Sequence, residues 1–203
     1  MKLVIIDYGM GNLYSLKSTI EHLGSSDVTI SNNISVINQA SKLFLPGVGS
    51  FVKAMNKIKM LKLDKILNDL IIKKKIPILG ICLGMQLLCN SSDEDGGAEG
   101  LGFIEAECKK FNFTNLKVPH VGFNQVELNI NAKINEGFNG KNDFYFTHSY
   151  KVQSNQDINC SFCDYGGDFI ASFEKENIIG TQFHPELSQT NGLKLLKNFL
   201  ENF

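Results

Sequence analysis

Arginine is absent from this 203-residue sequence, in which all twenty basic residues are lysine. Arginine is the side chain best suited to bidentate contacts with phosphate groups and with guanine. The acidic residues number 21, so the formal net charge is -1. Without arginine and without a basic excess, nucleic-acid binding is a poor prediction for this chain.

Long apolar runs are also absent. No stretch approaches the ~20 apolar residues that a membrane-spanning helix needs. The apolar start, residues 3–6, is too short for a signal peptide and is soon followed by Asp7 and Gly9. We therefore expect no membrane association and a location in the cytoplasm.

The cysteines do not form a disulfide framework, because five is an odd number and their spacing is irregular. Free thiols are therefore expected. Cys160 and Cys163 form a lone C-x-x-C with no further zinc ligands nearby. Gly9 and Gly11 do not complete a dinucleotide-binding motif. The sequence thus predicts neither a metal nor a cofactor.

The chain has an ordinary globular composition, with 43% hydrophobic and 20% charged residues, and its length fits a single domain spanning 1–203. In the first half, short apolar runs alternate with helical patterns, which predicts a parallel sheet covered on both faces. After Gly102 the pattern becomes β-rich. The fold predicted is α/β: a three-layer sandwich with a mostly parallel central sheet and a β-rich, antiparallel portion.

The individual elements follow from periodicity and from turn residues. Residue 12 is a candidate helix N-cap, residues 46–49 are a loop after a strand, and residues 91–100 are expected to be a polar surface loop. The predicted strands are 3–6, 28–30, 43–45, 77–81 and 178–183, the predicted helices are 13–23, 51–74 and 188–203, and the β-rich stretches are 103–126 and 144–185.

One segment is typical of a nucleophile elbow. Residues 80–86 (GICLGMQ) carry a buried strand through Gly-x-Cys-x-Gly into a helical run. Such a turn strains the backbone at Cys82 and leaves no room for side chains at the two flanking glycines. It would hold the thiol at a helix N-terminus, which favours the thiolate. The alternative is a cysteine buried in the core, as most cysteines are.

A base for this nucleophile is available near the end of the last predicted strand. There His184 and Glu186 are two residues apart, and in an extended chain they would share one face. A carboxylate beside an imidazole fixes its tautomer and stabilises its charged form. Cys82, His184 and Glu186 are therefore the candidate catalytic triad. His22, on the first predicted helix, is expected at the surface.

An oxyanion would need backbone donors. The amide of Leu83, directly after the nucleophile, is one donor by elbow geometry. The loop 46–49 follows a second parallel strand and could offer another amide, although a simple turn would look the same.

Taken together, these motifs resemble the class I (triad) glutamine amidotransferases, and within them the glutaminase subunits of imidazole glycerol phosphate synthases. The resemblance covers nearly the whole chain in order. It is carried by residues 7–12 (DYGMGN), 46–49 (PGVG), 80–86 (GICLGMQ), 118–124 (VPHVGFN), 145–150 (YFTHSY) and 184–186 (HPE).

The resemblance implies roles for further residues. Backbone amides at Gly49 and Leu83 would form the oxyanion hole, after a peptide flip in the loop that carries Gly49. L-glutamine would be held by Gly47, Gln86, Ser149 and Tyr150, partly through backbone groups. His120 and His148 would be structural residues or would lie at the edge of the site.

A partner is also implied, because ammonia must reach an acceptor without meeting water. The family's partner is a (β/α)8-barrel cyclase subunit, which forms a heterodimer with the glutaminase. It makes imidazole glycerol phosphate and the aminoimidazole carboxamide ribotide (AICAR) during histidine biosynthesis. Phe123 stands where the family commonly has tryptophan, and Leu187 where it commonly has lysine. Both positions are near the family's partner interface, so the alternative is a cyclase-like partner that amidinates surface sugars.

Overall fold

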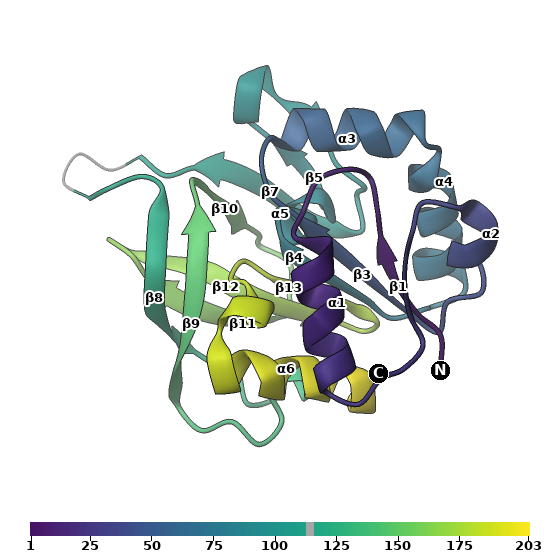
Figure 1. Ribbon diagram of the computed structural model, residues 1–203. Helices are drawn as coiled ribbons and strands as arrows, with labels where there is room; N and C mark the ends of the chain where they lie inside the picture. Colours follow the sequence, from purple (N-terminus) through teal and green to yellow (C-terminus); the bar gives the residue numbers. More distant parts are fainter. Residues whose placement is uncertain (113–115) are drawn as a thin grey trace.

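The computed structural model describes residues 1–112 and 116–203; residues 113–115 of the β-rich stretch predicted for 103–126 lie outside the described part. In the described part, thirteen strands form one mixed sheet with helices on both of its faces (Figure 1). The strands are β1 (Leu3–Ile6), β2 (Val28–Ser31), β3 (Lys42–Gly47), β4 (Ile78–Cys82), β5 (Cys89–Ser92), β6 (Ala98–Glu99), β7 (Ile104–Lys110), β8 (His120–Glu127), β9 (Lys141–His148), β10 (Tyr150–Gln153), β11 (Asn159–Asp164), β12 (Asp168–Lys175) and β13 (Ile178–Thr181).

The parallel part of the sheet has the order β2-β1-β3-β4-β13. All residues of β1, β3, β4 and β13 are buried, as expected for strands covered on both faces. The predicted parallel sheet is therefore confirmed. Since parallel strands end at one edge, the ends of β3, β4 and β13 bring residues distant in sequence together.

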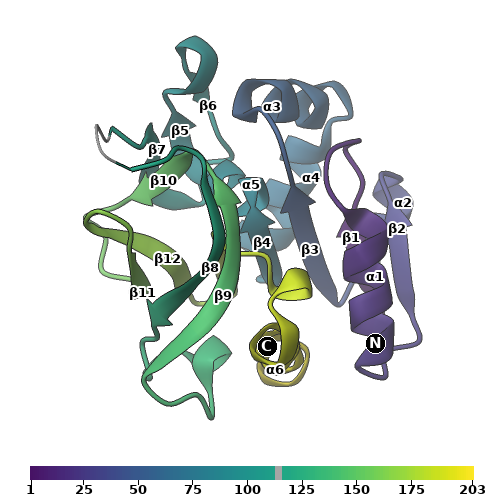
Figure 2. The same ribbon diagram turned by 60° about the vertical axis from the view of Figure 1, so that its left-hand side comes forward.

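The antiparallel part begins where β12 pairs with β13. From β12 the sheet continues antiparallel through β10 to β7; β5 then pairs parallel with β7 and antiparallel with β6. β11 also pairs with β12 and connects to the β8–β9 hairpin. Figure 2 shows this hairpin curving beside the last helix and away from the parallel strands. The predicted β-rich second half is confirmed.

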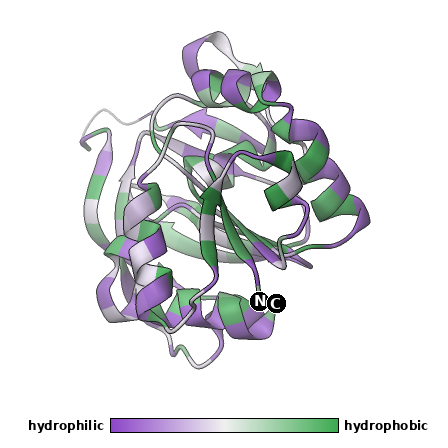
Figure 3. Cartoon of the chain, turned by 45° about the vertical axis from the view of Figure 1, so that its right-hand side comes forward, coloured by the Kyte–Doolittle hydropathy of each residue, from purple (hydrophilic) through white to green (hydrophobic). Residues whose placement is uncertain are grey.

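Two groups of helices cover the two faces of the sheet. Buried side chains of α1 and α6 pack with alternate strand residues on one face, and those of α2 to α5 pack on the other. Figure 3 shows the apolar strands between helices of mixed hydropathy. The helices are α1 (Leu13–His22), α2 (Ile34–Ile37), α3 (Phe51–Met60), α4 (Leu63–Asn68), α5 (Leu83–Leu87) and α6 (Gln189–Asn202), and α4 continues into a π-helical turn, Asp69–Lys73.

The continuous helix predicted over 51–74 is wrong. It is interrupted between α3 and α4 at Lys62, whose φ of 57° is left-handed. The break turns Leu63 and Leu67 into the core while Met60 stays exposed, so each of two short helices presents its own apolar face. Hydropathy alone could not locate this break, because the apolar spacing continues across it.

Three smaller differences concern the ends of elements. Asn12 is the N-cap of α1, but its side chain makes no capping hydrogen bond. The predicted polar loop 91–100 contains strand residues of β5 and β6. The predicted strand 178–183 ends at Thr181. In the described part, no helix is both long enough and apolar enough to cross a membrane.

Candidate active site

Cys82 is the last residue of β4 and directly precedes α5. Its backbone angles, φ 55° and ψ -112°, are strained for a residue with a side chain. The flanking glycines show why the turn needs them. A Cβ on Gly84 would lie 1.6 Å from the carbonyl oxygen of Leu45, and one on Gly80 would lie 2.8 Å from the carbonyl oxygen of Gly84. The segment has the strand–turn–helix form of a nucleophile elbow.

His184 and Glu186 form a buried pair. Nδ1 of His184 lies 2.8 Å from Oε1 of Glu186, and because a carboxylate only accepts, Nδ1 carries the proton. The extended geometry predicted for this pair is wrong: Pro185–Leu187 forms a 3-10 turn. The pair forms nonetheless, since the turn folds the carboxylate back towards the ring.

Cys82 approaches the other side of the same ring. Burial alone would lower the pKa of His184, but the Cys82 sulfur and the Glu186 carboxylate outweigh it and raise the pKa to about 10. Nε2 of His184 is buried and has no hydrogen-bond partner among the described residues. The structure therefore brings the three predicted triad residues together, and the sulfur and the carboxylate both favour a proton on the ring.

Strand β9 holds the turn that carries His184. The His184 amide donates to the carbonyl of Tyr145 at 2.9 Å, and the Tyr145 amide donates to Oγ of Ser188 at 2.9 Å. The Ser188 hydroxyl donates in turn to the carbonyl of His184 at 2.6 Å. These bonds fix the imidazole against β9 without using its ring nitrogens.

The loop 46–49 lies beside the elbow, because Gly47 of β3 pairs with Cys82 of β4. The Tyr8 hydroxyl donates to the Pro46 carbonyl at 2.8 Å, and a Cβ on Gly47 would lie 2.1 Å from that hydroxyl oxygen. Gly49 has a φ of 103°, which favours glycine. Leu83 directly follows Cys82 and is buried.

Gln86, on α5, lies among polar groups. Its Nε2 donates to the carbonyl of Tyr150 at 3.1 Å and to Oε1 of Gln182 at 2.9 Å. Nε2 of Gln182 donates to the Cys82 sulfur at 3.8 Å. Ser149 is half-buried between β9 and β10, and its carbonyl accepts from the amide of Phe111 at 3.0 Å.

Two polar residues near the site escape sequence reasoning. Gln182 is one, since nothing in its local pattern marks it. The other is Glu94, assigned above to the polar loop. Its carboxylate is half-buried and accepts from the Phe51 amide at 2.7 Å. Burial raises the pKa of Glu94. Burial and then the charges of Glu94, Asp93 and Asp95 also raise the pKa of Tyr150, one of the residues expected to hold glutamine.

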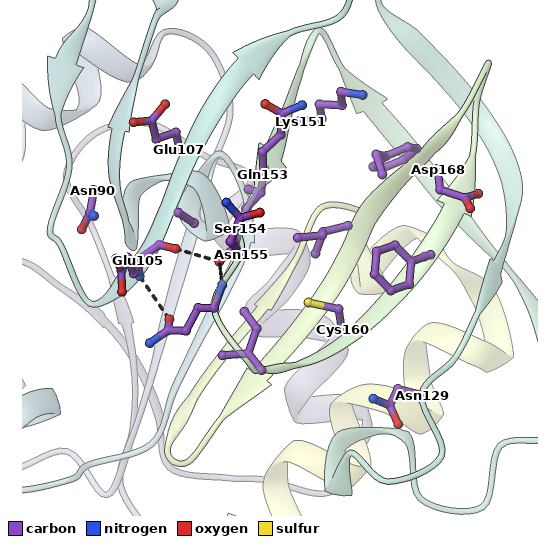
Figure 4. A pocket seen from close by; sticks show the side chains of 17 residues that line it. Asn90, Glu105, Glu107, Asn129, Lys151, Gln153, Ser154, Asn155, Cys160 and Asp168 are labelled. Carbon is purple, nitrogen blue, oxygen red and sulfur yellow. Dashed lines mark hydrogen bonds between the residues drawn. The ribbon is translucent and has the colours of Figure 1, made fainter.

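The other cysteines, His22 and a surface groove lie apart from the three candidate triad residues. All five cysteines are free, and Cys160 and Cys163 pack into opposite core clusters, so they do not act as a pair. His22 is exposed on α1, as predicted. An open groove of about 1060 Å³ lies over β7, β10, β11 and β12, lined by polar residues such as Glu105, Lys151 and Asp168, apart from the triad (Figure 4).

Known proteins are similar to this chain in sequence and in fold. The family model of "Glutamine amidotransferase class-I" matches residues 4–203. The solved structure of a "glutamine amidotransferase" superposes with a TM-score of 0.78 at 18% identity, covering 98% of this chain and 97% of the other. A putative GMP synthase subunit from Thermoplasma acidophilum superposes with a TM-score of 0.74 at 21% identity, covering 98% of this chain and 92% of the other. The chain belongs to the class I glutamine amidotransferase family.

Curated relatives narrow the comparison. The "Imidazole glycerol phosphate synthase subunit HisH 1" of Campylobacter jejuni subsp. jejuni serotype O:23/36 (strain 81-176) is 46% identical, over 97% of this chain and 98% of the relative. The "subunit HisH 2" of Methanococcus maripaludis is 45% identical over 98% of each chain. The "subunit HisH" of Aquifex aeolicus is 42% identical, over 98% and 96%.

Proposed function

We propose that this chain is the glutaminase subunit of an imidazole glycerol phosphate synthase, in which residues 1–203 act as one domain. The observation that carries the proposal is the convergence of Cys82 with the buried His184–Glu186 pair at the elbow. The curated relatives are named as subunits of imidazole glycerol phosphate synthase, which supports histidine biosynthesis as the pathway. Free thiols throughout suit the cytoplasm, where we place its action.

The reaction follows from the geometry of the triad. The Cys82 thiolate attacks the side-chain carboxamide carbon of L-glutamine, and a tetrahedral oxyanion forms. As the C–N bond breaks, the His184 imidazolium gives its Nε2 proton to the nitrogen, so that ammonia leaves and a γ-glutamyl thioester remains. His184 then takes a proton from water, the hydroxide attacks the thioester, and glutamate and the thiol are released. Glu186 keeps the ring oriented throughout.

Backbone amides of Gly49 and Leu83 stabilise the oxyanion in this scheme. Loss of one such donor costs about 10²- to 10³-fold in rate in comparable sites. The close approach of Tyr8 to Gly47 supports a loop held firmly at its base, beside the thiol. The freedom of Gly49 at positive φ suits a peptide that changes orientation when glutamine binds.

Glutamine binding uses further groups around the thiol. Gly47, Gln86, Ser149 and Tyr150 surround the carboxamide and the backbone of the substrate in our proposal. Glu94 adds a half-buried negative charge that acts on Tyr150, which suits the α-ammonium group of an amino acid. Glu94 would then select a free amino acid over an amide that lacks this charge.

The ammonia must pass to a partner, which we propose is a (β/α)8-barrel cyclase subunit. An exposed apolar surface supports a docking face next to the catalytic turn. Phe123 and Leu187 are 50% and 41% exposed, and the Phe123 ring contacts that of Tyr145, whose carbonyl holds the His184 amide. Aromatic side chains of this kind are typical anchors of interfaces.

The test is Cys82→Ala in the complex with its cyclase. We expect the loss of glutamine-dependent synthesis while synthesis from added ammonia is unchanged, because the acceptor site lies in the partner. Cys160→Ala, a half-buried cysteine away from the elbow, is the matched control. Normal glutamine hydrolysis by Cys82→Ala would overturn the triad. Co-purification with a sugar-amidinating cyclase-like protein in place of the histidine enzyme would overturn the pathway.

A further inference from the structure

Two buried histidines outside the triad form a pair. Nδ1 of His120, at the start of β8, lies 3.0 Å from Nε2 of His148, at the end of β9. Nδ1 of His148 lies 2.7 Å from the carbonyl oxygen of Tyr150. His120 is stacked between the rings of Tyr165 and Phe146, with centroid distances of 3.9 and 4.8 Å. The pair is thus a rigid unit between β8 and the substrate side of the site.

The direction of every hydrogen bond in this unit can be assigned, beginning at the Tyr150 end. A carbonyl only accepts, so Nδ1 of His148 carries a proton. For a neutral ring, Nε2 of His148 then accepts, and Nδ1 of His120 must donate to it. Nε2 of His120 is left as an acceptor.

The other end of the unit gives the same assignment independently. Oδ1 of Asn124 accepts from the Gln125 amide at 2.8 Å, and its Nδ2 donates to the carbonyl of Asp164 at 3.1 Å. The amide orientation of Asn124 is therefore fixed, and its Nδ2 faces Nε2 of His120 at 3.5 Å as a donor. Both rings must be neutral for every hydrogen bond in this series to have one donor and one acceptor. Burial lowers the pKa of His120 to about 4 and that of His148 to about 3, which agrees.

The unit ends on the residues that we propose hold glutamine. The carbonyl of Tyr150 that accepts from His148 also accepts from Nε2 of Gln86, which in turn donates to Gln182. Gln182 donates to the Cys82 sulfur. A continuous series of directed hydrogen bonds thus connects β8 with the nucleophile. On β8, side chains alternate, so His120 faces inward while its neighbour Val121 is exposed.

We propose that His120 and His148 are positioning residues that hold the Tyr150 carbonyl, and through it Gln86, in the geometry that binds glutamine. The proposal deepens the glutaminase function and rests on it. Neither ring acts as a base, because its nitrogens are committed to neighbours. The pair fixes the bend between β9 and β10 to the inner face of β8.

The first test does not depend on activity. Imidazole ¹⁵N NMR of the wild-type chain at pH 7 should show both rings neutral with the proton on Nδ1, whereas free histidine in water favours Nε2. A charged ring, or a proton on Nε2 of His148, would overturn the proposal whether or not the chain is a glutaminase.

The second test is His120→Phe, which keeps a stacked ring and removes the ring's hydrogen bonds to His148 and to Asn124. In the complex we expect the KM for glutamine to rise about tenfold, the effect of one lost buried hydrogen bond, with kcat changed much less. His22→Phe, the same change on exposed α1, is the control and should leave both constants unchanged. A folded His120→Phe variant with the KM of the control would overturn the positioning role. If that variant does not fold, the tautomers of the wild-type protein still decide.

Discussion

Replacing Glu186 with glutamine probes the electrostatics of the triad. The change keeps the size of the side chain and an acceptor for Nδ1 of His184, but removes the negative charge 2.8 Å from the ring. A rise in the pKa of His184 from 6.5 to about 10 corresponds to about 5 kcal/mol in favour of the imidazolium, at about 1.4 kcal/mol per pKa unit. Cys82 and Glu186 share this stabilisation against the penalty of burial.

The loss of Glu186's share has two consequences. The pKa of His184 should fall by roughly two units. The kcat for glutamine hydrolysis should fall about 100-fold. This is towards the lower end of what a general acid contributes, because the imidazole ring itself remains. The sign is fixed by the direction of the shift. A raised pKa keeps the active imidazolium present up to about pH 10 in the wild type, so the variant should lose activity at a lower pH.

The assay is the pH profile of kcat for glutamine hydrolysis by the complex, from pH 6 to 10.5. Glu176→Gln is the control, because that carboxylate is exposed and pairs with Lys75 on the surface. If Glu186→Gln kept the wild-type kcat and the same alkaline limit, the charge of Glu186 would play no part in holding the proton on His184. The reasoning from burial and Coulomb interaction would then be refuted.

Two further predictions concern the backbone. Gly84→Ala should cost about 3 kcal/mol of stability or more, because the added Cβ would overlap the Leu45 carbonyl. Gly96→Ala is the control: it has open space around it and should cost only about 1 kcal/mol, for its positive φ. Equal losses of the two variants in urea unfolding would contradict the packing argument. Lys62→Gly should raise the free energy of unfolding by up to about 1 kcal/mol, since glycine relieves the left-handed strain between α3 and α4. If the same measurement showed destabilisation, the contacts of the Lys62 side chain would matter more than its backbone conformation.

The parallel half of the fold is predictable because its strands have a strong local signature. A strand buried on both faces must be apolar throughout, and β1 and β4 are. The break at Lys62 has no such signature. An unbranched residue such as lysine can adopt a left-handed φ at a cost of about 1–2 kcal/mol, and here the tertiary gain of burying Leu63 offsets that cost.

The convergence of the three candidate triad residues is predictable for a related reason, although one step of the prediction fails. The elbow needs glycines at two fixed positions, and only backbone crowding of the kind seen at Gly84 enforces them. An extended chain predicts the pairing of His184 with Glu186, but a 3-10 turn makes it. Proximity along the chain was enough to predict the contact, because two residues separated by one can meet in either geometry.

Glu94 and Gln182 show where sequence reasoning ends. Glu94 acquires its position from an amide 43 residues earlier, at the start of α3, and Gln182 from its contacts with Gln86 and Cys82. In both cases the contact that places the side chain comes from a distant part of the sequence, so the local polar pattern does not reveal it. A side chain leaves a local signal when its own backbone is constrained, as at Cys82. When a side chain is held only by its partners, its position follows from the arrangement of the strands and not from its own sequence neighbours. Here the strand ends that meet at one edge of the sheet bring those partners together.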